Sequence, residues 1–284
     1  MVEPLATHGI EASKAVWDDP AVDWNSFDLC VVRSCWDYPF RHAEFLTWLE
    51  RVPRLANPPS VIAWNMHKRY LSDLAAEGIP TVATTWVHPT ETWALPPDGA
   101  WVIKPAMSLA SLDTGKYRMD DRAQRKLAVS HVVRLQKAGR TVMVQRHLPS
   151  IDREGETCLV FVDGQFSHAV RRRTVLTGPD TGADRRFEPY GALDLEPCTP
   201  DLCQVLTARH ALAAVPGGPF RLLYARVDLV HDPRGGPVVL EVELIEPQLY
   251  LAFAPDGAER LASGIAACVR RVRACACEPT SRRC

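Results

Sequence analysis

Three acidic residues in the C-terminal third of the chain have the types and spacing of a metal site. Asp228 lies in an apolar-alternating segment, and Glu241 and Glu243 lie in a second one, after the turn-forming sequence HDPRGG. Such a pair of segments predicts an antiparallel hairpin. Pairing that is symmetric about the bond between residues 234 and 235 places Asp228 opposite Glu241. It also places Arg226 opposite Glu243, and the two-residue period of a strand puts all four side chains on one face.

The crowded carboxylates on this face need a positive partner, because like charges that face each other destabilise a sheet. Oxygen ligands without His or Cys suit Mg²⁺. A solvent-exposed strand face that Arg226 neutralises is the alternative interpretation. The opposite face is expected to enter the core, and it consists of Val227, Leu229, Leu240 and Val242.

Two lysines occupy positions that suit phosphate binding. Lys104 ends an apolar strand at residues 100–105, before the small-residue loop AMSLASLDTG, and it can reach phosphates over which that loop closes. Lys68 begins a helix predicted at residues 67–77, where the helix dipole disfavours a cation unless an anion is bound. A snorkelling strand-end lysine and an ordinary surface lysine are the respective alternatives.

Further polar positions follow a strand predicted at residues 141–146. Residues 145–148 lead from it into an irregular stretch and offer backbone groups to a planar base. Glu156 starts the next strand, where its carboxylate either binds ribose hydroxyls or faces solvent. In the run of arginines at 171–173, the strand period points Arg172 one way and its two neighbours the other, so only one direction meets a site.

The elements that must position these residues predict an α/β (α+β) chain. A strand at residues 27–32 alternates with helices at 42–52 and 67–77 and a strand at 79–87, which indicates an α/β N-terminal domain. Later strands are expected at 156–163 and 165–171, and helices at 120–138, 202–215 and 257–271, with a loop over 174–200. We expect an N-terminal α/β domain at 1–64, two α+β subdomains at 65–141 and 142–273, and a flexible tail at 274–284. The first domain opens on a helix-like stretch rather than a buried strand, which suggests a shortened start.

Composition limits the possible classes of protein. The 284 residues are 46% hydrophobic and 24% charged with a net charge of −1, which gives no electrostatic reason to expect a nucleic-acid or membrane partner. No run of 18 apolar residues and no signal-peptide pattern occurs, so the expected location is the cytoplasm. The protein is expected to be a monomer or a homodimer. The nine cysteines lack paired CxxC spacing and leave a zinc or redox protein as a third interpretation.

The order of these features resembles the ATP-grasp superfamily. The segments RSCWDY, NPP, WNMHKRYL and EVELIEPQL are similar to motifs of a stand-alone group of ligases in it, and a similar pattern occurs in the cyclo-ligase that closes O-ureidoserine to cycloserine. The resemblance implies an ATP-grasp fold, in which two α+β subdomains sandwich ATP behind an N-terminal α/β (pre-ATP-grasp) domain.

The resemblance also implies roles for the matched positions. The expected ligands of Mg²⁺ are Asp228, Glu241 and Glu243. The residues expected to bind ATP are Lys68, Lys104, Ser108, Ser111, Gln145, Arg146, His147, Leu148 and Glu156, with Asp152 as an alternative ribose-binding acid. Arg172, Arg226 and Lys104 are expected at the transferred phosphate. The residues expected to meet the substrate are Arg33, Ser34, Trp36, Asp37, Arg171 and Glu246, of which Glu246 would receive an amine.

The implied function is an ATP- and Mg²⁺-dependent carboxylate–amine ligase that forms an acyl phosphate on a small amino-acid-like substrate, in natural-product biosynthesis. A nucleotide-binding protein with little or no ligase activity is the alternative. It is suggested by Leu109 and Ala110, which stand where the family usually has glycines that let a backbone approach phosphate closely.

Overall fold

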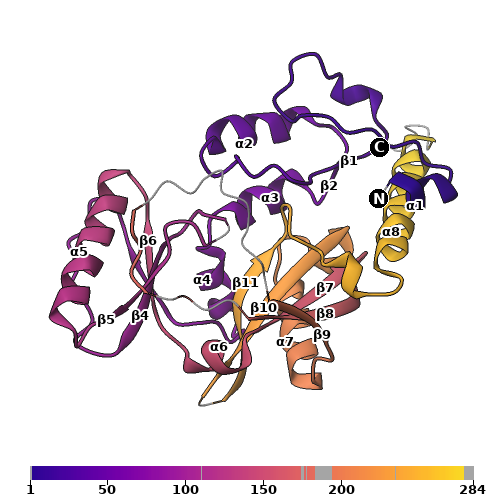
Figure 1. Cartoon of the computed structure of the whole chain (residues 1–284). Helices are drawn as coiled ribbons and strands as arrows, with labels where there is room; N and C mark the ends of the chain where they lie inside the picture. The colour runs from indigo at the N-terminus through magenta and orange to yellow at the C-terminus, as the bar shows by residue number, and fades with distance from the viewer. Residues whose placement is uncertain are drawn as a thin grey trace, which may run out of the picture.

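Two antiparallel sheets and a small N-terminal unit make up the computed structural model, which describes residues 2–109, 111–173, 176, 178–182, 194–233 and 235–277 (Figure 1). The four-stranded sheet of the central subdomain, called the central sheet below, lies on one side of helix α4 (Tyr70–Ala76). The five-stranded sheet lies on the other side of this helix. The apolar face of α4 joins the two sheets in one core, since Leu71 and Leu74 share a cluster with Met143 and Val242. No helix in the described part of the chain is long and apolar enough to cross a membrane.

The N-terminal unit contains more helix than strand. It contains α1 (Val2–Thr7), the 3₁₀ turn η1 (Trp24–Ser26), α2 (His42–Arg51) and α3 (Pro59–Met66), and its strands β1 (Cys30–Val31) and β2 (Leu55–Ala56) pair in parallel. The strand expected at 27–32 is therefore reduced to two residues. Aromatic side chains supply much of the packing, because Trp17, Phe45 and Trp48 contact one another edge to face or tilted.

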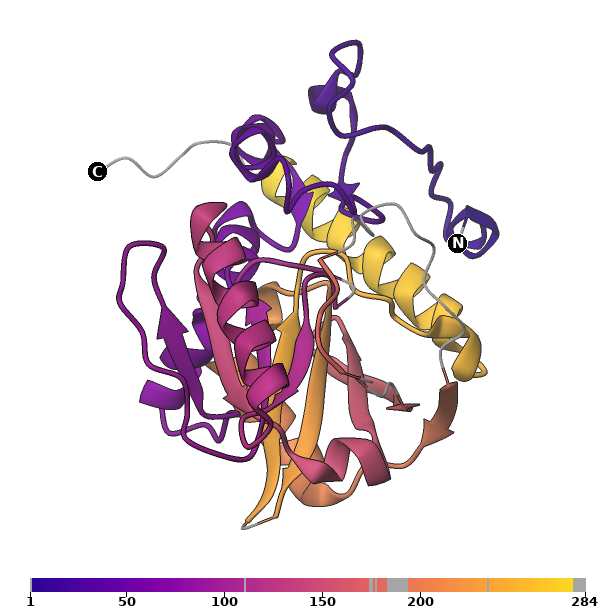
Figure 2. The same cartoon turned by 60° about the vertical axis from the view of Figure 1, so that its left-hand side comes forward.

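The central sheet has the strand order β3-β6-β4-β5, formed by β3 (Thr84–Val87), β4 (Ala100–Pro105), β5 (Gly115–Arg118) and β6 (Val142–Arg146). Helix α5 (Arg122–Lys137) covers its outer face (Figure 2) and starts at Asp121, whose carboxylate accepts from the amides of Ala123 and Gln124. Strand β6 pairs with β3 and β4, so the boundary expected after residue 141 would cut this sheet. We therefore propose a boundary after Arg146.

The larger sheet has the order β11-β10-β7-β8-β9 and contains β7 (Glu156–Val162), β8 (Gln165–Arg173), β9 (Asp194–Cys198), β10 (Tyr224–Asp232) and β11 (Gly236–Glu243). Its helical elements are α6 (Pro149–Glu154), α7 (Leu202–Ala213), the 3₁₀ turns η2 (Pro219–Arg221) and η3 (Leu251–Phe253), and α8 (Gly257–Cys277).

Three of these elements differ from the sequence-based expectation. Strand β9 lies within the stretch expected to be a loop; it is a polar edge strand with a proline, so it lacks an apolar pattern. Helix α6 occupies a stretch expected to be irregular, although a proline begins it and Gly155 with φ of 75° follows it. Helix α8 continues to Cys277, past the expected start of the tail at 274, and residues 278–284 lie outside the described residues.

The β10–β11 hairpin has the expected register at the acidic face. Arg226 pairs with Glu243 and Asp228 pairs with Glu241. A bulge follows, so Leu229 faces Val239 rather than Leu240. Val239 is fully buried and Leu240 only half-buried, which makes the expectation of Leu240 as a core residue wrong.

The buried side chain of Asn57 joins the N-terminal unit to the open end of this hairpin, where β10 begins and β11 ends. Its amide nitrogen donates to the carbonyl oxygens of Tyr224 (2.9 Å) and Leu244 (2.7 Å), and its oxygen accepts from the amide of Leu223 (2.8 Å). Its φ of 58° lies in the left-handed region, which Asn tolerates better than most residues.

We expect Asn57→Ala to lower the free energy of unfolding by about 3 kcal/mol, because it leaves three buried backbone groups without partners. Urea unfolding of this variant and of the exposed control Asn25→Ala measures the difference. Equal stability of the two variants would show that the Asn57 hydrogen bonds contribute little.

Candidate active site

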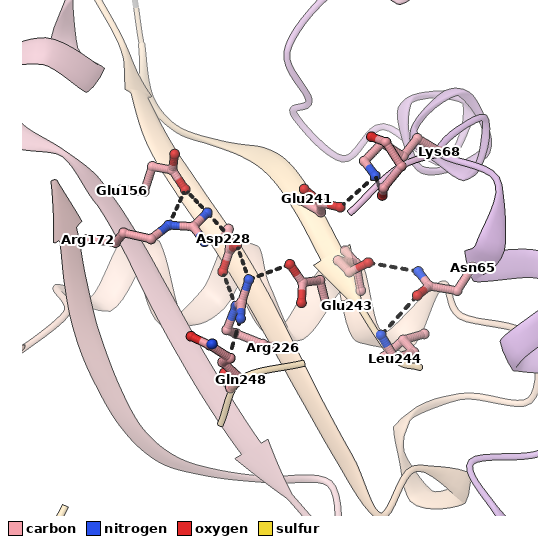
Figure 3. A network of polar contacts seen from close by, with 12 residues as sticks. Asn65, Lys68, Glu156, Arg172, Arg226, Asp228, Glu241, Glu243, Leu244 and Gln248 are labelled. Carbon is pink, nitrogen blue, oxygen red and sulfur yellow. Dashed lines mark hydrogen bonds and ion pairs between the residues drawn. The ribbon is translucent and has the colours of Figure 1, made fainter. Parts of the chain in front are cut away.

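Acidic and basic side chains gather on the face of the hairpin that the sequence singled out (Figure 3). The acids lie on strands β7, β10 and β11, and the bases come from β4, β8, β10 and the turn between α3 and α4. The acids are Glu156, Asp228, Glu241 and Glu243, and the bases are Lys68, Lys104, Arg172 and Arg226. With every group ionised, the formal charges of this set cancel.

Arg226 and Asp228 form the innermost pair, with exposed fractions of 2% and 0%. The guanidinium donates to both carboxylate oxygens, at 2.8 and 2.9 Å, and also to the Gln248 carbonyl oxygen at 3.0 Å. It lies 5.3 Å from the ring centroid of Tyr250. Burial alone would raise the pKa of Asp228, but Arg226 and Arg172 outweigh it and hold that pKa below its usual value.

Arg226 also donates to Glu243, so the guanidinium lies between two of the three expected metal ligands. Glu243 is less well compensated than Asp228. Burial, with further contributions from Glu241 and Asp228, raises its pKa to about 7 despite Arg226. Arg226 therefore neutralises carboxylates of this face, as the alternative interpretation of the hairpin expected.

Arg172 extends the network to the third strand. It donates to the Glu156 carboxylate from two of its nitrogens and to Asp228 Oδ2 at 3.3 Å. Arg171 and Arg173 point the other way, as strand alternation predicts. Arg171 donates to the Glu154 carbonyl oxygen at 3.0 Å, which places it away from the acidic face, so its assignment to a substrate site stays a prediction that no contact on this face supports.

Lys68 and Lys104 approach Glu241 from the central subdomain. Lys68 Nζ lies 3.0 Å from Glu241 Oε1 and donates to the Ser108 carbonyl oxygen at 2.8 Å. The Lys104 ammonium makes no hydrogen bond or ion pair within the described part of the chain, and burial lowers its pKa despite the attraction of Glu241. Lys68 precedes α4 instead of starting it, so the argument from the helix dipole does not apply there.

The carboxylates of this face suit a hard cation better than its sulfur does, but the described structure does not gather the ligand atoms of Asp228, Glu241 and Glu243 within 4.8 Å of one another. The ligand atoms that lie within 4.8 Å of one another in the described residues are those of Glu156, Cys158 and Asp228. Burial raises the pKa of the Cys158 thiol well above its usual value, so Cys158 stays neutral and is a poor ligand for Mg²⁺. Carboxylate oxygens remain, and the balanced charge of the face means that an added polyphosphate needs an accompanying cation.

The expected adenine segment lies at the end of β6. The Gln145 side chain donates to Thr84 Oγ1 at 2.8 Å, and the His147 amide donates to the Ala100 carbonyl oxygen at 2.9 Å. That amide is therefore not free for a base. Arg146 is exposed, and Leu148 precedes α6.

Asp152, the alternative ribose-binding acid, lies outside the Arg172 network. Its carboxylate is 2.8 Å from His147 Nε2 and 3.1 Å from Lys116 Nζ. Glu156 is thus the acid that the structure brings to the hairpin face.

Arg33 and Glu246 lie near each other at the border of the N-terminal unit. The Arg33 guanidinium is 5.6 Å from the Tyr224 ring centroid, and the Tyr224 hydroxyl lies 2.8 Å from the Val32 carbonyl oxygen. Glu246 Oε2 is buried without a hydrogen-bond partner in the described structure. Burial and then the negative charge of Glu243 raise the pKa of Glu246 to about 8, which Arg33 partly opposes.

The other expected substrate residues of the RSCWDY segment differ in their contacts. Asp37 accepts from Trp17 Nε1 at 3.0 Å and from Arg41 at 3.1 Å, so its carboxylate links parts of the N-terminal unit, while its side chain stays 38% exposed. Ser34 and Trp36 are exposed, and Ser34 has a positive φ of 58°.

Two residues that no expectation assigned to the site hold the edge of β11. The Asn65 side chain donates to the Val242 carbonyl oxygen at 2.7 Å and accepts from the Leu244 amide at 2.9 Å, so it pairs with the strand as a peptide group would. The Tyr70 hydroxyl lies 2.9 Å from both the amide and the carbonyl oxygen of Val242. Both occur in the segment WNMHKRYL, but only contacts across the fold reveal their task.

Comparison with known proteins places this chain among ligases. The family model for the N-terminal domain of D-cycloserine synthetase DcsG matches residues 1–57. The cycloserine biosynthesis protein DcsG of Streptomyces lavendulae is 38% identical over 281 residues, which cover 94% of this chain and 91% of the relative.

Solved structures agree with this placement. A crystal structure of D-cycloserine synthetase DcsG has a TM-score of 0.81 and 36% identity, covering 94% of this chain and 93% of its own. The RimK domain ATP-grasp protein from Sphaerobacter thermophilus has a TM-score of 0.59 at 17% identity, covering 94% and 92%. D-alanine–D-alanine ligase from Bacillus anthracis, in complex with ATP, has a TM-score of 0.55 at 17% identity, covering 81% and 75%, and like the RimK protein it supports the fold alone. By sequence identity and coverage, the chain belongs to the family of the cycloserine synthetase DcsG, within the ATP-grasp ligases.

Proposed function

We propose that this ligase uses ATP and Mg²⁺ to activate the carboxylate of a small amino-acid-like substrate for attack by a nitrogen nucleophile. The observation that carries the proposal is the set of four basic and four acidic side chains on one hairpin face, with Lys104 left unpaired in the described structure. Its 38% identity to a cycloserine biosynthesis protein supports a role in natural-product biosynthesis.

The chemistry follows from the properties of these residues. A substrate carboxylate oxygen attacks the γ-phosphorus of ATP, the bond to the bridging oxygen breaks, and ADP leaves. The nitrogen then attacks the acyl carbon, loses a proton and displaces phosphate, which leaves an amide. Lys68, Lys104 and Arg172 offset the charge that moves during phosphoryl transfer, and this kind of catalysis depends on positioning and electrostatics. Asp228, Glu241 and Glu243 would hold Mg²⁺, which neutralises phosphate charge when bound.

The substrate would lie between this face and the N-terminal unit. Arg226 would bind the reacting carboxylate, since its guanidinium already binds carboxylates on the face. Glu246 and Arg33 lie close enough to affect each other's charge; Glu246, once it has lost its proton, would suit the amine of an amino acid, and Arg33 would suit its carboxylate.

Incubation with ATP, Mg²⁺ and a panel of amino acids tests the function. We expect ADP release that depends on an added amino acid, together with a product detected by mass spectrometry. A product lighter than one substrate by a water molecule would mean cyclisation, and one that joins two substrates would mean condensation. ATP binding without turnover across the panel would contradict ligase activity.

Glu241→Gln should lower Mg²⁺-dependent ADP formation by about 100-fold or more, since it removes a charged ligand at the phosphates. The variant should stay folded, because the Glu241 side chain is 23% exposed. The control is Glu196→Gln, which alters an exposed acid paired with Arg173. Turnover at the parent rate would exclude Glu241 from the metal site.

Lys104→Ala should weaken ATP binding without loss of stability, because it removes a half-buried cation that has no pairing partner in the described residues. Lys68→Ala should lower both, since it leaves Glu241 and the Ser108 carbonyl oxygen without a partner. Calorimetric titration with ATP and thermal denaturation of both variants measure the two effects. Unchanged ATP affinity in Lys104→Ala would contradict the assignment.

Glu246 predicts a pH dependence of stability. Because its pKa is about 8 in the folded protein, above the usual 4.5, the folded state binds more protons between these values. Stability should therefore fall as the pH rises through this window and level off above it. Glu246→Gln should remove this part of the fall, which urea unfolding at about pH 5, 7 and 9 would measure against the parent. Identical pH profiles would contradict a protonated Glu246.

A further inference from the structure

The loop after Lys104 holds an unfavourable backbone shape without glycine. Ser111 and Asp113 have φ values of 56° and 54°, in the left-handed region. This conformation costs an ordinary residue roughly 1–2 kcal/mol, and Asp somewhat less. Other interactions must hold residues 111–114 in this form.

Two arginines hold Asp113. Arg134 Nη1 donates to its Oδ1 at 2.9 Å, and Arg140 Nη1 donates to its Oδ2. Arg140 also donates to the Met107 carbonyl oxygen at 2.9 Å, so one side chain ties the start of the loop to its end. The Asp113 side chain is only 12% exposed, and in such partial burial an ion pair is less weakened by solvent.

The same loop contacts the network on the hairpin. Lys68 donates to the Ser108 carbonyl oxygen at 2.8 Å from its side chain and to the Ala106 carbonyl oxygen at 2.8 Å from its backbone. The shape of the loop is therefore linked to the position of a lysine that pairs with Glu241.

Arg134 also connects the loop after Lys104 with a second segment, which contains Gly178 and Asp180. It also pairs with Asp180, whose backbone amide donates to the Tyr117 hydroxyl at 3.1 Å. The Lys116 amide donates to the Gly178 carbonyl oxygen at 2.9 Å. A Cβ atom at Gly115 would lie 2.5 Å from the amide nitrogen of Asp180, so this close approach requires glycine there.

We propose that Asp113 is a positioning residue, which uses Arg134 and Arg140 to hold residues 106–109 and 111–114 in the form that binds the phosphates of ATP. The ion pairs take the place of glycines in this loop. The inference depends on the proposed function, because it presumes that the loop meets the nucleotide. Asp113 itself touches no reacting group; it acts through the loop backbone.

The test is calorimetric titration of the full-length protein with Mg²⁺ and ATP, and separately with adenosine. Asp113→Asn keeps the size of the side chain and its tolerance of positive φ but removes the charge. We expect its affinity for ATP to fall by about tenfold or more, as for loss of charged hydrogen bonds, with adenosine affinity unchanged.

Asp163→Asn is the matched control, because Asp163 also has a positive φ (47°) and pairs with an arginine, Arg271, in the β7–β8 turn. Its ATP affinity should equal that of the parent. Asp113→Gly separates charge from backbone freedom: it should lose ATP affinity like Asp113→Asn, although it relieves the unfavourable φ.

Parent-like ATP affinity in either Asp113 variant would overturn the positioning role. An equal loss of adenosine and ATP affinity would also overturn it, because that pattern indicates general disruption of the fold. If the parent itself bound no ATP with Mg²⁺, the proposed function would fail, and the role of Asp113 with it. The parent titration therefore distinguishes the two failures.

Discussion

The buried ion pair between Arg226 and Asp228 is the constraint on which the site depends. Both side chains are almost completely enclosed, and breaking such a pair by removing one partner typically costs about 3–5 kcal/mol. Each group is kept in place by the other. Asp228 also accepts a hydrogen bond from Arg172, and Arg226 also donates one to Glu243. A face built around this pair must be balanced in charge, so a polyanionic ligand enters it most favourably with a cation.

The three parts of the chain meet at the edge of β11. Asn65 of α3 and Tyr70 of α4 pair with this strand, while Lys68, from the turn between these two helices, and Lys104, from β4 of the central sheet, approach its Glu241. Because the alternate residues of β11 enter the core or the charged face, fixing one strand edge fixes the carboxylates as well. The acidic face is thus a consequence of packing between subdomains and not of the hairpin alone.

Local pattern predicted the parts of the structure in which neighbours along the chain determine the outcome. Strand alternation and the HDPRGG turn gave the pairing of Asp228 with Glu241, which the structure confirms. Alternation also separated Arg172, which contacts Glu156 and Asp228, from Arg171, which contacts the Glu154 carbonyl oxygen instead. The bulge beside Leu229 was not predictable, because it depends on which of two adjacent apolar residues packs better.

Contacts between different segments were not predictable either, because they depend on packing and not on the local pattern. Asp37 was expected to meet the substrate at a strand end, and nothing in the local pattern indicated that its carboxylate also accepts from Trp17 and Arg41. The loop after Lys104 looked deficient because it lacks glycine, and its arginine partners lie more than 20 residues further along the chain. Neither relation leaves a periodic signal in the sequence.

The charge-balanced hairpin face should receive ATP together with a divalent cation. Calorimetric titration of the protein with ATP, once in the presence of Mg²⁺ and once in the presence of a chelator, measures whether it does. Tight binding with Mg²⁺ and much weaker binding in the chelator are the predicted results. Equal affinity under the two conditions, or no binding with Mg²⁺, would contradict this expectation.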